Sequence, residues 1–364
     1  MPGAHEPGLD FIVSRSDWSK TRFEDGPAPE AGAGEVLFRV DRFAFTANNI
    51  SYAKAGDMLR YWDFFPAAEG EGRIPVMGFG DSVASGHPDV SEGLRVFGFF
   101  PMSRYLVIQP ASVGPGGIVD GADHRQGIAP AYNTYSPMDA GTAPAHEDAH
   151  MLMRGLFLTS FLVDDYVAEQ GGFGAEQVVI TSASSKTGIA LAWLVSRDGG
   201  RKAIGLTSAR NAAFVKSLGY YDDVVLYEDV ESIAKVPTIA VDMAGSGSVI
   251  NRLHHHLGDD MRYSCSVGAT HFDDTPREGE LPGAQPEFFF APGQIQKRAR
   301  EWGAEELERR IGSAWTGFRD ASDAWLEVVR GAGREAVERV YRETLEGRTA
   351  PSQGHVVSLW EDPR

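Results

Sequence analysis

The alternation of apolar and polar residues divides the chain into a β-rich first part, an α/β middle part and a mainly helical last part. In the first part, Val36, Phe38 and Val40 alternate with polar neighbours, which is the period of a strand with one buried face. Glycine and proline punctuate residues 74–110, which predicts short strands and turns in a compact, barrel-like domain. In the middle part, short apolar runs alternate with helical patterns, which predicts a parallel sheet covered by helices. We expect strands at 178–181, 203–207, 224–227, 238–242 and 262–267, helices at 187–198, 209–218 and 247–257, and a last strand at 355–359.

The segment 177–210 has the order strand, small-residue turn, helix, strand, which is the first half of a dinucleotide-binding βαβ unit. A pyrophosphate reaches the amides at a helix N-terminus only where the side chains around it are small. Serine stands at two positions where this motif usually has glycine, and its hydroxyl can donate to phosphate oxygens. An ordinary strand–helix turn that binds nothing is the alternative. The predicted pyrophosphate cradle consists of Ser182, Ser185, Lys186, Thr187 and Gly188.

The end of the second strand of this unit bears on the choice between NADH and NADPH. Enzymes that use NAD usually hold the ribose hydroxyls with an acidic residue there. This chain has Thr207, Ser208 and Arg210 instead, and none of them is acidic. Because an arginine can pair with a 2′-phosphate, the sequence favours NADPH. An arginine that is merely solvated at a helix start is the competing interpretation.

Composition narrows the range of partners and locations. The net charge of −17 argues against nucleic acid and anionic membranes, which would repel the protein. No window is long and apolar enough to cross a bilayer, and the first ten residues lack a secretory signal pattern. The single cysteine, Cys265, suits a reducing compartment. We therefore expect a cytoplasmic protein with no membrane or nucleic-acid partner.

Longer stretches resemble the medium-chain dehydrogenase/reductase superfamily, and most of all its zinc-independent quinone and enoyl reductases. The stretches are GEVLFRVDRFAFTANNISYAKAG, PVMGFGDSVASG, VVITSASSKTGIA, VDMAGSG and GHVVSL. Two further signatures, TANNISYAKAGDMLRYWDFFPA and FFFAPGQIQKRAREWG, resemble the DUF2855 family of unknown function. The resemblance implies an α/β fold with two domains. Residues 1–150 and 286–364 would form a GroES-like β-barrel substrate domain, and residues 151–285 a Rossmann-type doubly wound parallel sheet.

The same resemblance implies candidate residues on the substrate side. Tyr52 lies in the substrate loop and is the first candidate for a proton donor, and His271 is the second. Asn49 would donate a hydrogen bond to the carbonyl oxygen of the substrate. For each residue, a role in packing is the alternative. The active site would lie in the cleft between the domains, and a homodimer would form through the edge of the Rossmann sheet.

Three further residues are cofactor candidates by position. Tyr227 would pack near the adenine edge, although packing in the core is an equal alternative. Asp242 closes the fourth strand of the sheet, where the crevice of such folds lies. Backbone groups around Gly268 would hold the nicotinamide carboxamide.

No catalytic metal is expected. Zinc alcohol dehydrogenases have His-Glu beside a glycine in the segment that reads Gly78-Phe79-Gly80-Asp81 here, and neither ligand is present. Three consecutive histidines, 254–256, point in different directions on a helix, and we interpret them as a solvated helix end.

The sequence therefore predicts an NADP-dependent oxidoreductase that reduces a small conjugated carbonyl compound, such as an enone, a quinone or an enoyl ester. Three alternatives stay open: an NADPH-dependent aldehyde or ketone reductase, a relative that binds NADPH without turnover, and a lyase or hydrolase on the same scaffold.

Overall fold

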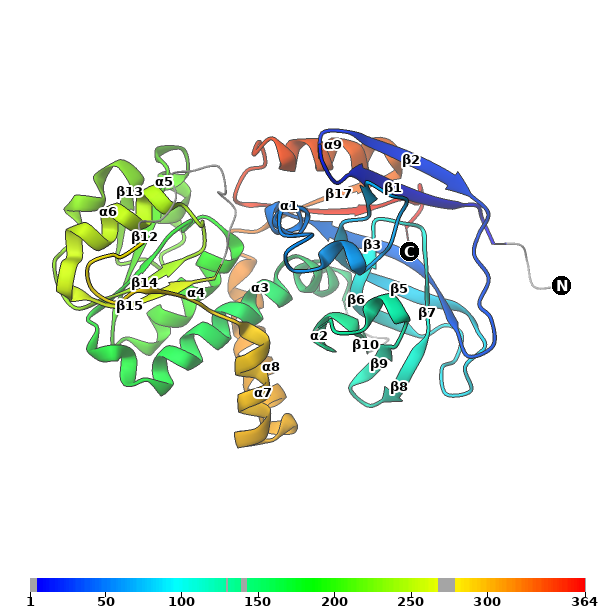
Figure 1. Ribbon diagram of the computed structural model, residues 1–364, viewed down its shortest axis with the longest axis horizontal. Helices are drawn as coiled ribbons and strands as arrows, with labels where there is room; N and C mark the ends of the chain where they lie inside the picture. Colours follow the sequence, from blue (N-terminus) through cyan, green and yellow to red (C-terminus); the bar gives the residue numbers. More distant parts are fainter. Residues whose placement is uncertain (1–4, 129, 139–142, 268–278, 364) are drawn as a thin grey trace. The chain divides into compact units, whose positions relative to one another are not determined.

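The computed structural model describes residues 5–128, 130–138, 143–267 and 279–363 (Figure 1). The chain divides into two compact units: unit 1 comprises residues 1–152 and 327–364, and unit 2 comprises residues 153–326. Unit 1 is built mainly of antiparallel sheet, and unit 2 contains a parallel sheet with helices. The predicted fold class, a β-sheet domain combined with a Rossmann-type domain, is thus confirmed. None of the helices within the described ranges is long and apolar enough to cross a membrane.

Unit 1 contains a sheet in the strand order β17-β18-β3-β5-β6-β10-β9-β8, with β7 also paired to β3. Strands β1, β2 and β4 form a separate sheet. The helices of unit 1 are α1, α2, α9 and the start of α3 (Pro144–Glu169), which continues into unit 2 after Leu152, and its 3-10 turns are η1 and η2. The bounds are β1 Gly8–Ser14, β2 Thr21–Gly26, β3 Val36–Phe45, α1 Ala47–Lys54, η1 Tyr61–Asp63, β4 Glu71–Gly72, β5 Pro75–Ser85, β6 Arg95–Pro101, β7 Tyr105–Ile108, β8 Pro110–Gly114, β9 Gly117–Asp120, η2 Asp123–Arg125, α2 Pro130–Asn133, β10 Thr134–Pro137, β17 Glu327–Ala332, α9 Gly333–Leu345 and β18 Gln353–Ser358.

Strand β3 has two faces because its side chains alternate, and the predicted apolar face is confirmed. Val36, Phe38 and Val40 are buried in the core of unit 1. The pairing with β5 then shifts, since Val40 lies opposite Gly80 and Arg42 lies opposite Phe79. This β-bulge at Asp41 changes which way the following side chains point. Asp41 and Arg42 both enter a polar network, while Phe43 rejoins the core.

Unit 2 contains a sheet of parallel strands in the order β13-β12-β11-β14-β15-β16. Renumbered within this sheet, the order is 3-2-1-4-5-6, which is the order of a Rossmann fold. Every strand and helix expected between residues 178 and 267 is present within a residue or two. The bounds are α3 Pro144–Glu169, η3 Gly171–Gly174, β11 Gln177–Ile180, α4 Lys186–Asp198, β12 Lys202–Thr207, α5 Ala209–Ser217, β13 Asp223–Leu226, η4 Tyr227–Ser232, β14 Thr238–Asp242, α6 Gly247–Leu257, η5 Gly258–Asp260, β15 Met261–Ser266, β16 Pro286–Phe288, α7 Ala291–Trp302 and α8 Ala304–Ser322.

The division into units differs from the expected domain boundary at residues 286–326, which group with unit 2. Helix α8 packs by aromatic contact on elements of that unit. The ring centroid of Phe318 lies 5.3 Å from that of Phe157 on α3 and 5.6 Å from that of Trp193 on α4. The sequence predicted a mainly helical last part, but not which core the apolar faces of these helices cover.

The histidine run also differs from expectation. His254 is fully buried, and its ring nitrogens hydrogen-bond the carbonyl oxygen of Pro282 and the hydroxyl of Ser264, both at 2.9 Å. It faces the core because α6 turns a strongly apolar side toward the sheet, with Val249, Ile250 and Leu253. The interpretation as a solvated helix end is therefore wrong for His254.

Candidate functional site

The loop that follows β11 has the compact geometry that a phosphate cradle requires. Ser182 adopts a left-handed backbone conformation with φ of 49°. Ser185 is the N-cap of α4, and its hydroxyl accepts the Gly188 N–H at 3.0 Å. A Cβ on Gly188 would lie only 2.9 Å from the Ser182 carbonyl oxygen, so this position requires glycine. The first N–H groups of α4 have no acceptor inside the helix and are oriented for an anion.

Side chains from neighbouring elements hold this loop. The Ser182 N–H donates to the Tyr227 hydroxyl at 2.9 Å. The Asn211 amide on α5 donates to the Ser184 hydroxyl at 3.0 Å. The sequence did not single out Asn211, and it placed Tyr227 at the adenine edge or in the core. The structure packs the Tyr227 ring against the core that contains Val179 and Leu206, which agrees with the core alternative, and its hydroxyl accepts the hydrogen bond from the loop backbone.

Lys186 adds a cation at the first position of α4. Burial lowers the pKa of its ammonium group to about 8. Its charge therefore changes within a pH range that is accessible to experiment. Thr187, the next residue, is tied to α3 because its carbonyl oxygen accepts the Ser160 hydroxyl at 2.8 Å.

The predicted ribose-side residues lie together where β12 ends and α5 begins. Thr207 is buried, Ser208 is the N-cap of α5, and Arg210 is exposed in the first helical turn. No acidic side chain occurs between residues 207 and 211. Because β11 and β12 are adjacent and parallel, their carboxyl ends bring these residues to the same edge of the sheet as the Ser182 loop.

Asp242 organises the turn that follows β14. Its Oδ1 accepts hydrogen bonds from the Thr181 hydroxyl at 2.8 Å and from the N–H groups of Gly245 at 3.0 Å and Ala244 at 3.1 Å. The carboxylate thus connects the end of β11, where the predicted cradle begins, to the turn after β14. Gly268 and His271, the two candidates after β15, lie outside the described residues.

In unit 1, the Asn49 side chain stabilises the first turn of α1. Its Oδ1 accepts the Thr46 N–H at 2.8 Å, and its Nδ2 donates to the Pro75 carbonyl oxygen at 2.9 Å. The first of these bonds belongs to a capping box. The side chain therefore connects α1 to β5, and the spacing Thr46-x-x-Asn49 is the signal from which this role was predictable.

Tyr52 lies in an aromatic cluster. Its ring centroid is 4.4 Å from that of Tyr61 and 5.9 Å from that of Phe99, and all three rings are buried. Burial raises the pKa of the Tyr52 hydroxyl well above its usual value, with a smaller upward effect from Tyr132 and a hydrogen bond to Asn48 acting in the opposite direction. The hydroxyl therefore keeps its proton at neutral pH. The cluster also includes Phe64, Phe65 and the partly buried Tyr132.

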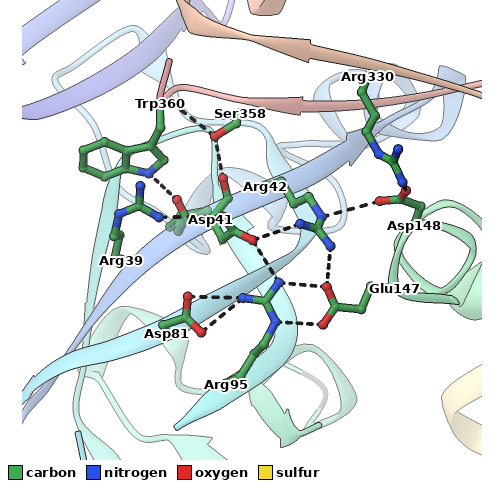
Figure 2. A network of polar contacts seen from close by, with 11 residues as sticks. Arg39, Asp41, Arg42, Asp81, Arg95, Glu147, Asp148, Arg330, Ser358 and Trp360 are labelled. Atoms are coloured by element: carbon green, nitrogen blue, oxygen red, sulfur yellow. Dashed lines mark hydrogen bonds and ion pairs between the residues drawn. The ribbon is translucent and has the colours of Figure 1, made fainter. Parts of the chain in front are cut away.

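The segment in which zinc enzymes carry His-Glu holds an arginine network in this protein (Figure 2). The Arg95 guanidinium lies over the Phe79 ring at 5.1 Å from its centroid. It donates to Asp81 at 3.1 and 3.2 Å, to Glu147 at 2.7 and 2.8 Å and to Asp41 at 2.8 Å. Within the described ranges, no group of three His, Cys, Asp or Glu side chains is arranged to hold a metal ion.

The network also fixes the first turn of α3 to the sheet of unit 1. Arg42 pairs with Glu147 and lies 3.4 Å from the buried Asp148. Arg330 on β17 reaches the same Asp148 carboxylate. Burial raises the pKa of Asp148 above its usual value, although Arg330 and Arg42 act in the opposite direction.

A cavity of about 520 Å³ lies elsewhere in unit 2, among α3, α4, α7 and α8. It is lined by Asp164, Trp193, Arg197 and Trp302, among others. Trp193 and Arg197 belong to the second half of α4, away from the loop at the start of that helix. The cavity therefore does not coincide with the predicted cradle.

Comparison with solved structures places the fold. CurA from Vibrio vulnificus matches with a TM-score of 0.63 at 15% identity, over 98% of this chain and 100% of that chain. A putative NADPH:quinone reductase from Mesorhizobium loti matches with a TM-score of 0.64 at 15% identity, over 97% and 98%. A mutant enoyl thioester reductase from Candida tropicalis gives 0.60 at 10% identity, over 97% and 100%. These likenesses show that the chain has the fold of the medium-chain dehydrogenase/reductase superfamily.

Among curated proteins, none matches the sequence. A family model does match, over residues 43–350, and its description is protein of unknown function, DUF2855. This match covers most of the chain and agrees with the two signatures noted in the sequence. The chain is a member of the DUF2855 family.

Proposed function

We propose that the protein binds NADPH at the loop from Ser182 to Gly188 and uses it, without zinc, to reduce a conjugated carbonyl compound. An enone, a quinone or an enoyl ester is the proposed substrate class. Solved structures of the same fold include one described as a putative NADPH:quinone reductase and a mutant enoyl thioester reductase, and CurA was determined in complex with NADPH. These neighbours support the proposal, and the proposed substrate class is taken from the same resemblance.

The observation that carries the proposal is the geometry of the loop. The position of Gly188 leaves no room for a Cβ, and small side chains surround the start of α4. Such a helix start accepts a pyrophosphate because its N–H groups and its dipole both favour negative charge. Lys186 would add a charge next to the phosphates. The residues present therefore fit the dinucleotide.

Selectivity for the 2′-phosphate is proposed to come from Arg210, with Ser208 beside it. Arg210 is exposed at the end of β12, where an acidic residue would repel a phosphate. Tyr227 would contribute indirectly, since its hydroxyl holds the backbone of Ser182. Thr207, Asp242 and Gly268 remain proposed cofactor-side residues.

The bound cofactor would supply hydride to the β-carbon of the conjugated carbonyl. Tyr52 is the proposed proton donor because the family resemblance places it in the substrate loop, although burial raises the pKa of its hydroxyl and makes it a weaker acid than an exposed tyrosine. His271 is the second candidate. Asn49 would act by fixing α1, because its side chain already bonds Thr46 and Pro75. The aromatic cluster around Tyr52 would offer an apolar surface to a planar substrate.

The first experiment is a calorimetric titration of the protein with NADPH and with NADH. We expect NADPH to bind in the micromolar range and NADH much more weakly. The matched control is Gly188→Val, whose side chain would collide with the Ser182 carbonyl oxygen and displace the loop, so it should abolish binding of both nucleotides. If neither nucleotide bound the unaltered protein, the reductase proposal would be rejected.

A second experiment separates the candidate reactions. NADPH oxidation is followed with a panel of enones, quinones, aldehydes and ketones, and the products are identified. Saturation of the C=C bond supports the proposal, whereas an alcohol product supports the alternative aldehyde or ketone reductase. Tight binding of NADPH with no oxidation across the panel would identify a non-catalytic relative.

We also propose a homodimer formed through the outer edge of β16, in a cytoplasmic setting. Phe288 and Phe290 at this edge are 66% and 58% exposed. Large exposed apolar side chains beside β16, the last strand of the sheet in the described part of the chain, favour association with a second copy. Light scattering of the protein and of Phe288→Glu tests this, since the variant should be monomeric.

A further inference from the structure

Arg154, on α3, lies in an environment that a buried arginine rarely occupies. Its side chain is only 16% exposed, and it makes no hydrogen bond to any residue that the structure describes. Its Nη1 is buried without an acceptor. The nearest acidic group is Glu308, whose Oε2 lies 3.8 Å from Nη2 and whose side chain is 73% exposed. The Trp315 ring flanks the guanidinium at 5.8 Å.

Two other largely buried arginines of this chain, Arg95 and Arg125, have hydrogen-bond acceptors that Arg154 lacks within the described ranges. Arg95, at 21% exposure, donates to three carboxylates. Arg125, fully buried, donates to the Asn133 side chain and to the carbonyl oxygens of Phe64 and Tyr132. The two environments act on the pKa in opposite directions. Burial lowers the pKa of Arg154, with only Glu308 opposing it, whereas the bonds to Glu147 and Asp41 outweigh burial at Arg95 and raise its pKa.

The position of Arg154 along α3 relates it to the predicted cradle. Ser160, six residues further on, bonds the carbonyl of Thr187 at the start of α4. Beyond Ser160, Val163 and Val167 pack in the core with β11 and α4, so this part of α3 runs alongside the sheet. At 1.5 Å per residue, Arg154 lies about 9 Å from Ser160 along the helix axis, on the side of the strand carboxyl ends. Ligands of open α/β sheets bind at that edge.

We propose that Arg154 binds the carboxylate of a small-molecule ligand. A buried cation without a hydrogen-bond acceptor destabilises the ligand-free protein. Such a cost is typical of residues whose acceptor is supplied by a bound ligand. If the proposed reductase function holds, on which this last step rests, the ligand is the substrate, and the substrate class narrows to conjugated carbonyl compounds that carry an acid group.

A carboxylate suits this site better than a phosphate. A guanidinium pairs with either group through two parallel N–H bonds. Glu308, however, adds a negative charge within 4 Å of the same guanidinium, and a dianionic phosphate would be repelled more strongly than a singly charged carboxylate. The Trp315 ring offers an apolar surface to the carbon skeleton next to the acid group.

The test measures thermal unfolding, which needs no turnover. The probes are 4-oxo-2-pentenoate, its methyl ester and inorganic phosphate, each with wild-type protein and with Arg154→Met. We expect the acid, but neither the ester nor phosphate, to raise the melting temperature of the wild type. Arg154→Met should lose this response and should melt at the same temperature as the free wild type or higher. The reason is that it removes a largely buried charge that, among the described residues, makes no hydrogen bond and has only the exposed Glu308, at 3.8 Å, as an ionic partner. Calorimetry should show at least a tenfold loss of affinity for the acid.

Arg197→Met is the matched control, since Arg197 is an exposed arginine of the same unit, and it should keep the response to the acid. Three results would overturn the proposal: a large drop in the melting temperature of free Arg154→Met, an equal response to acid and ester, or no response of the wild type to the acid. A response to phosphate alone would overturn the assignment to carboxylates.

The outcome for Arg154 is separable from the outcome for the reductase function. Acid binding that depends on Arg154, without any oxidation of NADPH, would uphold the carboxylate site and reject the reductase. NADPH oxidation with the ester as fast as with the acid would uphold the reductase and reject the carboxylate site.

Discussion

Replacing Arg95 by methionine should destabilise unit 1 far more than the same replacement at a surface arginine. Arg95 lies at the centre of the network in Figure 2, and its guanidinium donates hydrogen bonds to the carboxylates of Asp41, Asp81 and Glu147. Methionine has a similar length and no charge, so the substitution removes the guanidinium without opening a large cavity. Three carboxylates would remain in a buried region with a reduced positive charge.

The magnitude follows from the burial of these groups. Removing one partner of a buried ion pair costs about 3–5 kcal/mol, because the remaining charge is left without compensation. Arg95 is 21% exposed and Arg42 still neutralises part of the network, so we expect the lower end, about 3 kcal/mol. A domain of roughly 150–250 residues loses about 2–4 °C per kcal/mol, which gives a drop of about 6–12 °C if unit 1 unfolds as one cooperative unit.

Arg22→Met is the matched control. Arg22 also donates to two carboxylates, at 2.7 and 2.9 Å to Glu71 and at 3.0 Å to Glu24, but it is 44% exposed. Exposed pairs of this kind contribute about 0–1 kcal/mol. Equilibrium unfolding in urea measures both variants, with the slope expected to stay unchanged. Equal losses of stability in Arg95→Met and Arg22→Met would refute the argument from burial. In the background of Glu147→Gln, Arg95→Met should cost less stability than it does in the wild type, because one of the stranded carboxylates is gone. An undiminished cost in that double variant would also refute the argument.

Three further predictions concern unit 2. Arg210→Gln should weaken NADPH binding at least tenfold and leave NADH binding nearly unchanged, which calorimetry tests; equal losses would contradict the assignment to the 2′-phosphate. NADPH affinity should fall as the pH rises through about 8, where Lys186 loses its charge, and Lys186→Met should flatten this dependence. Because the folded pKa of Lys186 lies below its usual 10.5, its destabilising effect on the fold is full below pH 8 and disappears as the pH rises toward 10.5. Cys265 should react with a thiol reagent only after unfolding, because burial raises its pKa to about 12; rapid reaction of the native protein would show that the strand opens.

The parallel sheet was predictable because each of its features is local. Every strand from β11 to β15 is a short apolar run bounded by turn residues, and the connecting helices are short and periodic. The crossover rule constrains the hand of each connection, while the strand order itself was expected only from the resemblance to a Rossmann-type sheet. The small-residue loop at Ser182 was found in the same way, since its position after a strand and before a helix is visible in the sequence.

The arginine network was not predictable, because its members come from distant segments and depend on a shift in strand pairing. Asp41 and Arg42 are consecutive, yet the bulge in β3 brings both into one network. Their partners lie on β5, β6, α3 and β17. A reading of β3 by strict alternation would place Asp41 and Arg42 on opposite faces of the sheet.

The backbone of Ser182 gives a physical reason to regard its loop as a binding site rather than an ordinary turn. A residue other than glycine in the left-handed region costs about 1 kcal/mol or more, and such strain persists only where surrounding contacts impose it. Here the Tyr227 hydroxyl fixes the Ser182 N–H, and Gly188 packs against the Ser182 carbonyl. A turn that served only to connect β11 to α4 would relax by placing glycine at 182 or by moving away from Gly188. The chain instead keeps the strained, close-packed form, in which the proposed phosphate would reach the start of α4.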